Sequence, residues 1–161
     1  MLETSPCDQA GDPPPAAQAT ADIRNPHTVA RELAEALPHN VLVGLTVRVG
    51  DEFAVRAWSS PRAKLAEESQ LISDAAPNRT ALNEDVAVTV ADLDGETRWS
   101  DCRAQLRLLG VRSLHCRGMR AANGTTAVLA VYAERPHVLD ASLDPAVAAA
   151  CHQIVAMMDG R

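Results

Sequence analysis

VTVADLDGETRWSDCRAQLRLLGVRS, the stretch from Val88 to Ser113, contains in order a predicted strand, a polar loop, an amphipathic helix and the start of a second strand. Apolar side chains recur at helical spacing from Trp99 to Leu109. Gly110 follows them and is the residue type that most often ends a helix. The residues from Val88 to Val90 are mostly β-branched, as is typical of a strand. The stretch therefore predicts two strands joined by a loop and a helix.

The rest of the chain alternates between the same kinds of element. Asn25 and Ser60 each precede a proline, an arrangement typical of a helix N-terminus, and Asn123-Gly124 is a strong hairpin signal. Short turns between neighbouring strands make the sheet mainly antiparallel, with helices on its faces, which is an α+β fold. The predicted helices span residues 26–37, 61–76, 79–83, 99–109 and 145–158, and the predicted strands span residues 41–49, 53–58, 86–90, 111–119 and 125–133.

The composition of the chain excludes several classes of protein. The 161 residues carry a formal net charge of −6, and only 2% of them are aromatic. An acidic chain with few rings argues against nucleic-acid binding and against base stacking. No apolar run is long enough to span a bilayer and the N-terminus lacks a signal-peptide pattern, so we expect a cytoplasmic protein without a membrane partner. Residues 1–24 are rich in proline and alanine and predict a disordered tail before a single domain at 25–161.

Several motifs resemble those of a GAF domain, most closely the actinobacterial GAF module that is usually fused to an RNA-binding ANTAR domain. The resemblance covers about residues 27–158 and implies a GAF/PAS-like, six-stranded, mainly antiparallel sheet flanked by helices. No ANTAR domain follows the last predicted helix, so we expect the output to pass through another protein. The motifs that carry the resemblance are Val90-Ala-Asp-Leu93, Glu96-Thr-Arg-Trp-Ser100, Gly110-Val-Arg-Ser113 and Ala127-Val-Leu-Ala-Val-Tyr132.

The sequence departs from the family pattern around the family's ligand cavity. Asp74-Ala-Ala-Pro-Asn78 stands where the family has G-E-G-P-C, and Cys116-Arg-Gly-Met119 lacks the family's proline. The resemblance implies a cavity lined by residues 77–83, helix 99–109 and strand 111–119. The candidate ligand-binding residues are Asn78, Trp99, Cys102, Arg112 and His115.

Charged residues near the quoted stretch allow two interpretations. Asp92, Arg98 and Arg112 either bind an anionic effector or form ion pairs that fix the loop before the helix, and such pairs are usually structural. Trp99 is expected to anchor the start of the helix in the core, because large aromatic side chains dominate packing.

The cysteines and histidines show no convincing catalytic or metal-binding pattern. His115 and Cys116 are adjacent on a predicted strand and therefore face opposite sides of the sheet. Cys102 and Cys116 are the only candidate pair for a thiol-dependent reductase of the GAF-like methionine sulfoxide reductase type, a reaction that needs a thiolate of low pKa. That family's surrounding residues are missing. We predict no catalytic residue, no metal site and no cofactor.

The terminal helices are the second candidate site. The resemblance implies that the first and last helices of the domain pack against a second subunit, and the helix from Pro145 to Met158 is rich in alanine and methionine. Small residues permit close helix packing, and methionine suits adaptable interfaces. The alternative is that the same face packs on its own sheet. The candidate interface residues of the predicted homodimer are Val29, Leu33, Val147, Cys151, Ile154, Val155 and Met158.

Together these patterns predict a diverged GAF domain that acts as a non-enzymatic signalling or regulatory module. It would act through dimerisation or through a separate regulatory protein. The alternative is a small-molecule sensor with an effector in the GAF cavity, and the thiol-dependent reductase is a third possibility.

Overall fold

The computed structural model describes residues 25–160, so the predicted tail at residues 1–24 lies outside the described part of the chain. The elements were expected from their local sequence, and most of them form close to the predicted positions. In chain order they are α2 (Pro26–Ala36), β1 (Leu42–Val49), β2 (Glu52–Trp58), α3 (Pro61–Ile72), α4 (Pro77–Glu84), β3 (Ala87–Val90), α5 (Ser100–Leu108), β4 (Ser113–Arg120), β5 (Thr126–Ala133) and α6 (Asp144–Met158).

The five strands form one antiparallel sheet in the order β2-β1-β5-β4-β3. The most apolar strand, β5, lies at its centre, and all eight of its residues are buried. The resemblance implied six strands, whereas residues 25–160 form the five that the β-branched runs predict. The connections between them form helices, 3-10 turns and loops instead.

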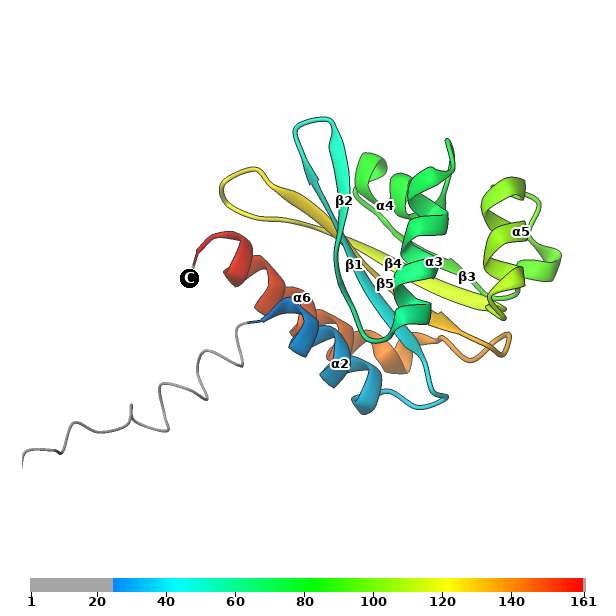
Figure 1. The fold of residues 1–161 in the computed structure, drawn as a ribbon. Helices are drawn as coiled ribbons and strands as arrows, with labels where there is room; N and C mark the ends of the chain where they lie inside the picture. The colour runs from blue at the N-terminus through cyan, green and yellow to red at the C-terminus, as the bar shows by residue number, and fades with distance from the viewer. Residues whose placement is uncertain (1–24, 161) are drawn as a thin grey trace, which may run out of the picture.

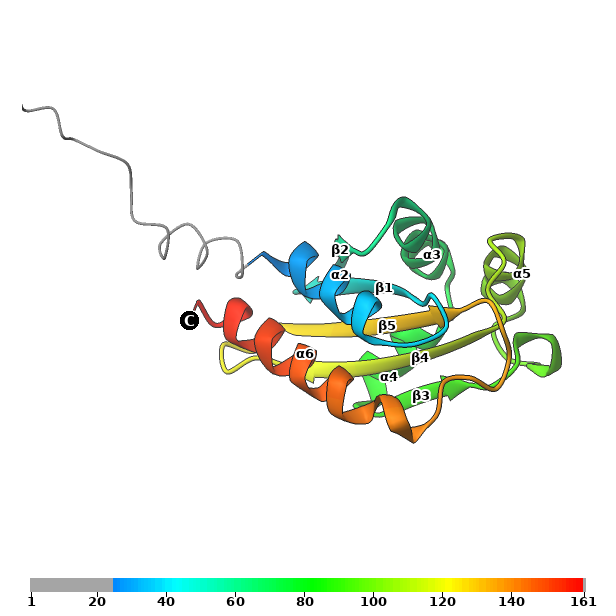
Figure 2. The ribbon, with the colours of Figure 1, turned by 90° about the horizontal axis from the view of Figure 1, so that it is seen from below.

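Helices cover both faces of this sheet. Helices α2 and α6 lie side by side on one face, and α3, α4 and α5 lie on the other (Figures 1 and 2). Because side chains alternate along a strand, β5 supplies both cores. Leu129 and Val131 pack toward α2 and α6, whereas Val128, Ala130 and Tyr132 pack toward α3, α4 and α5.

Local signals explain where the helices begin and end. The side chains of Asn25 and Ser60 accept hydrogen bonds from the first turns of α2 and α3, as the sequence predicts. Gly110 has a φ of +85° just after α5, which glycine adopts without strain. Trp99 precedes α5 rather than beginning it, with a φ of 53°.

Candidate functional site

Helix α3 presents the opposite face to the one that its sequence predicts. Leu65, Leu71 and Ile72 are the apolar positions of the helix predicted at residues 61–76, and helical periodicity predicts that they face the core. Leu65 is nevertheless 50% exposed and Ile72 is 74% exposed. Glu67 and Gln70 are buried instead, together with the small residues Ala63 and Ala66. A helix that buries a carboxyl and an amide while exposing two aliphatic side chains is costly unless the polar groups are paired. Glu67 is therefore the centre of the candidate site.

Glu67 accepts hydrogen bonds from three elements. Its Oε1 atom accepts from Thr46 Oγ1 of β1 at 2.8 Å, and its Oε2 atom accepts from Asn78 Nδ2 of α4 at 3.3 Å. Oε2 also accepts from the hydroxyl of Tyr132 on β5. Among the described residues, no Lys, Arg or His forms a salt bridge with this carboxyl. The carboxylate is thus held by dipoles and not by a counter-ion.

Gln70 connects two of these partners to each other. Its Nε2 atom donates to Tyr132 Oη at 2.7 Å and lies 3.9 Å from Cys116 Sγ, while its Oε1 atom accepts from the backbone N–H of Asn78 at 2.7 Å. Asn78 Oδ1 is the buried side-chain polar atom that has no hydrogen-bond partner within residues 25–160. We call Thr46, Glu67, Gln70, Asn78 and Tyr132 the buried polar cluster.

Almost no empty space remains beside the buried polar cluster. The void next to it has a volume of about 10 Å³, roughly the size of one water molecule. Arg79 closes the void from outside, because its guanidinium lies 4.7 Å from the centre of the Phe53 ring. Backbone carbonyls of Ser73 and Leu71 accept hydrogen bonds from the same guanidinium, each at 2.9 Å. The side chains themselves therefore fill the space between the sheet, α3 and α4.

Burial dominates the electrostatics of this region. Burial raises the pKa of Glu67 to about 7, although the hydrogen bonds from Tyr132, Thr46 and Asn78 oppose the shift. Burial likewise raises the pKa of the Cys102 thiol to about 11 and the pKa of the Cys116 thiol well above its usual range. Neither cysteine is disposed to form a thiolate near neutral pH.

The five predicted ligand-binding residues do not form one site. Asn78 belongs to the buried polar cluster, and Cys102 packs in the same core layer. Trp99 is half-buried at the outer end of α5, where the Arg98 guanidinium stacks 4.2 Å from its ring centre. Arg112 is half-buried beside the loop that precedes α5. His115 faces the opposite side of the sheet, where Thr89 Oγ1 lies 2.7 Å from its Nδ1 atom. His115 and Cys116 do face opposite sides, as the strand alternation predicts.

The charged residues near α5 form ion pairs. Arg112 contacts Asp92 at 3.1 Å and Asp94 at 3.3 Å, and Arg98 contacts Glu96 at 2.8 Å. Of the two interpretations drawn from the sequence, the geometry favours the structural one. These contacts fix the loop before α5.

The structure places most residues of the predicted dimer interface against the protein's own sheet. Each of these lies on the helix side that closes the core between α2, α6 and the strands. Val155 and Met158 alone among them remain half-exposed. The residues that the fold places in the core are Val29, Leu33, Val147, Cys151 and Ile154.

Two surface hollows accompany the exposed aliphatic residues of α3. One has a volume of about 250 Å³ and is lined mainly by Leu65, Ile72, Leu108 and Leu109. The adjoining hollow, of about 290 Å³, shares Ile72 and Gln105 with the first. Together they form what we call the α3–α5 groove. Its lining includes the carboxylates of Glu68, Asp74 and Asp101 and no lysine or arginine.

Sequence reasoning missed most of the buried polar cluster. Glu67, Gln70 and Thr46 were not singled out, because each looks unremarkable within its own segment. Tyr132 was named only as the last residue of a motif that carries the resemblance. One signal was available: Ala63, Ala66 and Gln70 share a helical face with Glu67. That face of small residues suits close packing on a sheet better than the face that carries Leu65 and Ile72.

Solved structures with this arrangement place the fold. The GAF domain region of a putative membrane protein from Geobacter sulfurreducens matches 91% of this chain and 99% of its own, with a TM-score of 0.69 and 13% identity. The chain has the GAF fold. A putative GAF sensor protein from Burkholderia vietnamiensis matches over 87% and 88% of the two chains, with a TM-score of 0.61 and 17% identity.

The same fold also occurs in an enzyme. The type II free methionine-R-sulfoxide reductase from Thermoplasma acidophilum matches 86% of this chain and 94% of its own, with a TM-score of 0.69 and 10% identity. No protein-family model and no curated protein sequence matches this chain. Within residues 25–160, no helix is long and apolar enough to cross a membrane, and no three metal-binding side chains gather at one place.

Proposed function

We propose that this GAF-fold chain is a non-enzymatic signalling or regulatory module that acts through protein contacts. The observation that carries the proposal is the filled interior. A void of about 10 Å³ admits one water molecule and no organic effector, so the side chains that would surround a ligand surround one another. The eroded motifs at Asp74–Asn78 and Cys116–Met119 agree with this reading. They also fit a diverged relative of the GAF modules that precede ANTAR domains.

The α3–α5 groove is the surface that we assign to a separate regulatory protein. Leu108 is 82% exposed at its edge, and Ile72 is 74% exposed. Exposed aliphatic side chains around a hollow are typical of interaction sites. Because three carboxylates and no basic residue line the groove, two copies of the chain would repel each other there. The expected occupant is an apolar segment of another protein with lysine or arginine beside it.

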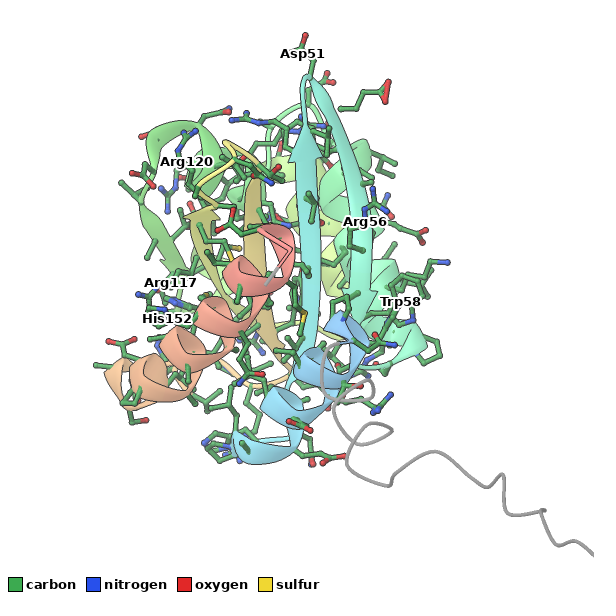
Figure 3. The ribbon with its side chains drawn as sticks, turned by 90° about the vertical axis from the view of Figure 1, so that its left-hand side faces the viewer. Asp51, Arg56, Trp58, Arg117, Arg120 and His152 are labelled. Atoms are coloured by element: carbon green, nitrogen blue, oxygen red, sulfur yellow. The ribbon has the colours of Figure 1, made fainter. Side chains whose placement is uncertain are left out.

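The groove between the C-terminal end of α6 and the sheet is the surface that we assign to a second copy. It has a volume of about 460 Å³ and is lined by Met157 and Met158 together with Leu45, Val47 and Arg56 of the strands. Figure 3 views this side, with Arg117 and His152 to one side of α6 and Arg56 to the other. Alanines and half-exposed methionines permit close helix contact.

The thiol-dependent reductase is disfavoured by the state of its thiols. Cys102 and Cys116 are fully or almost fully buried, and burial raises the pKa of both. A reductase needs an accessible thiolate to attack the sulfoxide.

The small-molecule sensor requires the buried polar cluster to open before any effector enters. Three free thiols, Cys102, Cys116 and Cys151, also support the proposed cytoplasmic location.

Charge-introducing variants test the two surfaces separately. The full chain is purified from its own host together with the proteins that copurify with it. Each of these proteins is then purified separately, and its direct binding to the chain is measured. We expect Leu108→Glu to weaken that reconstituted binding at least tenfold, whereas Val49→Glu, another exposed aliphatic position, leaves it unchanged. Equal binding by both variants would overturn the assignment of the α3–α5 groove.

Sedimentation equilibrium tests the dimer. We expect wild type and Leu108→Glu to sediment as dimers and Met158→Glu to sediment as a monomer with an unchanged circular dichroism spectrum. A monomeric wild type, or a Met158→Glu variant that still forms dimers, would contradict the assignment of α6.

A further inference from the structure

The ionisable centre of the buried polar cluster has no role in the contacts proposed above. Glu67 is completely buried, whereas Leu65 and Ile72 of the same helix are exposed. Removing a carboxyl from water costs free energy, most of all in its ionised form. The carboxyl is therefore a poor choice for stability alone, and its two protonation states make different demands on their neighbours.

The ionised state satisfies the carboxylate but leaves one neighbour unsatisfied. Thr46, Asn78 and Tyr132 all donate to Glu67, which is the pattern that a carboxylate requires. In this state Asn78 Oδ1 is buried without a partner. A buried acceptor without a donor costs free energy comparable to a lost hydrogen bond.

The protonated state reverses this arrangement. A protonated Glu67 carries an O–H that needs an acceptor, and a half-turn of the Asn78 side-chain amide brings Oδ1 to the place that Nδ2 occupies, 3.3 Å from Oε2. The new proton then satisfies the previously unpaired oxygen, and Nδ2 takes the place that Oδ1 leaves. Each protonation state thus pairs one end of the Asn78 amide with Glu67.

Asn78 connects this exchange to helix α4. It lies in the first turn of α4, and its backbone N–H is held by Gln70, which also binds Tyr132. Helix α4 packs tightly on the sheet, since a Cβ atom on Gly118 would come within 2.9 Å of the Ala81 carbonyl oxygen. The exchange at Asn78 therefore takes place inside a tightly packed contact between α4 and the sheet.

We propose that Glu67 and Asn78 form a proton-binding site in which protonation of the carboxyl turns over the side-chain amide of Asn78. The ligand of this GAF-fold chain is then a proton, which needs no cavity. The inference goes beyond the proposed protein contacts and does not depend on them.

The groups that face Glu67 leave this carboxyl as the titrating group near neutral pH. From β4 and β5 they are Cys116 and Tyr132, and from α5 Cys102; the pKa of each is raised further from neutrality by burial. Thr46 of β1 and Gln70 of α3 do not ionise. Arg79 of α4 lines the void, but its guanidinium is held by backbone carbonyls and the Phe53 ring.

Carbon-13 NMR of the full chain between pH 5 and 9 tests the proposal. We expect the Glu67 Cδ resonance to titrate near pH 7, because burial raises the pKa of this carboxyl to about 7. The side-chain amide of Asn78 and the backbone amides from Asn78 to Leu82 should shift with the same midpoint. Their transition should vanish in Glu67→Gln and persist in Glu68→Gln, a matched change one residue away on the half-exposed side of α3.

A second variant keeps the test decisive if Glu67→Gln does not fold. Thr46→Val removes one donor to the carboxylate, so the midpoint of Glu67 should rise. The proposal is overturned if Glu67 titrates near the ordinary value of 4.5, or if it titrates near 7 while the Asn78 and α4 signals stay constant. Neither result bears on the partner or dimer surfaces, which have their own variants.

Discussion

A Cβ atom on Gly44 would lie 2.3 Å from Cγ of Glu67 and 2.7 Å from its Cδ. Real side chains do not approach so closely, so β1 accepts the Glu67 side chain only because residue 44 is glycine. The relationship joins a strand and a helix that are adjacent in space but separated by the β1–β2 hairpin. Burial of Glu67 therefore requires a glycine at position 44 of the sheet.

Gly44→Ala should therefore destabilise the fold strongly. The added methyl forces Glu67 out of its hydrogen bonds, and overpacking of this kind costs about 1–3 kcal/mol or more. Gly95→Ala is the matched control, since a Cβ atom there meets nothing within 4 Å, and we expect a change within about 0.5 kcal/mol. Urea denaturation measures both. Equal stability of the two variants would show that the Gly44 contact relaxes without cost.

The stability of the protein should fall as the pH rises through neutrality. Burial raises the pKa of Glu67 from 4.5 to about 7, so the folded state binds a proton more tightly than the unfolded state does. This stabilisation is complete below pH 4.5 and is lost as the pH rises through 7, with a total of roughly 3 kcal/mol. Urea denaturation at intervals from pH 5 to 8.5 measures it. A flat profile in wild type, or an equal slope in Glu67→Gln, would rule out this carboxyl as the cause.

The thiols of Cys102 and Cys116 should be unreactive in the folded protein. Both are buried, and the pKa of Cys102 is raised to about 11, so thiolate is scarce at pH 8. Alkylation followed by peptide mass mapping should show modification of these two residues only when urea is added. Rapid labelling of either one under native conditions would reopen the reductase interpretation.

Arg112→Gln should cost little stability and act locally. The guanidinium binds both oxygens of Asp92 and one of Asp94, and these side chains are partly exposed. Ion pairs of this kind contribute about 1 kcal/mol or less. We expect faster hydrogen exchange in residues 92–96 and an unchanged rate in β5. Arg120→Gln, at an exposed position on the same strand's far end, serves as the control.

The sequence predicts the framework of this fold because its signals are local. Each of these signals acts within a few residues of its own position. Examples are the caps at Asn25 and Ser60, the turn at Asn123-Gly124 and the apolar run of β5. The sequence of α3 does not predict which of its faces is buried, because the strands that surround Glu67 are distant along the chain. Tyr132 lies 65 residues from Glu67 along the chain, and neither segment contains a pattern that predicts their contact.

Native mass spectrometry of the full chain purified from its own host tests the central claim, that the module acts through protein contacts without an organic effector. Mild conditions preserve both assemblies and bound molecules. The groove beside α6 predicts a dimer, alone or with a partner protein, and the filled interior predicts no small-molecule adduct. A stoichiometric organic adduct on the folded chain would contradict the claim and restore the small-molecule sensor.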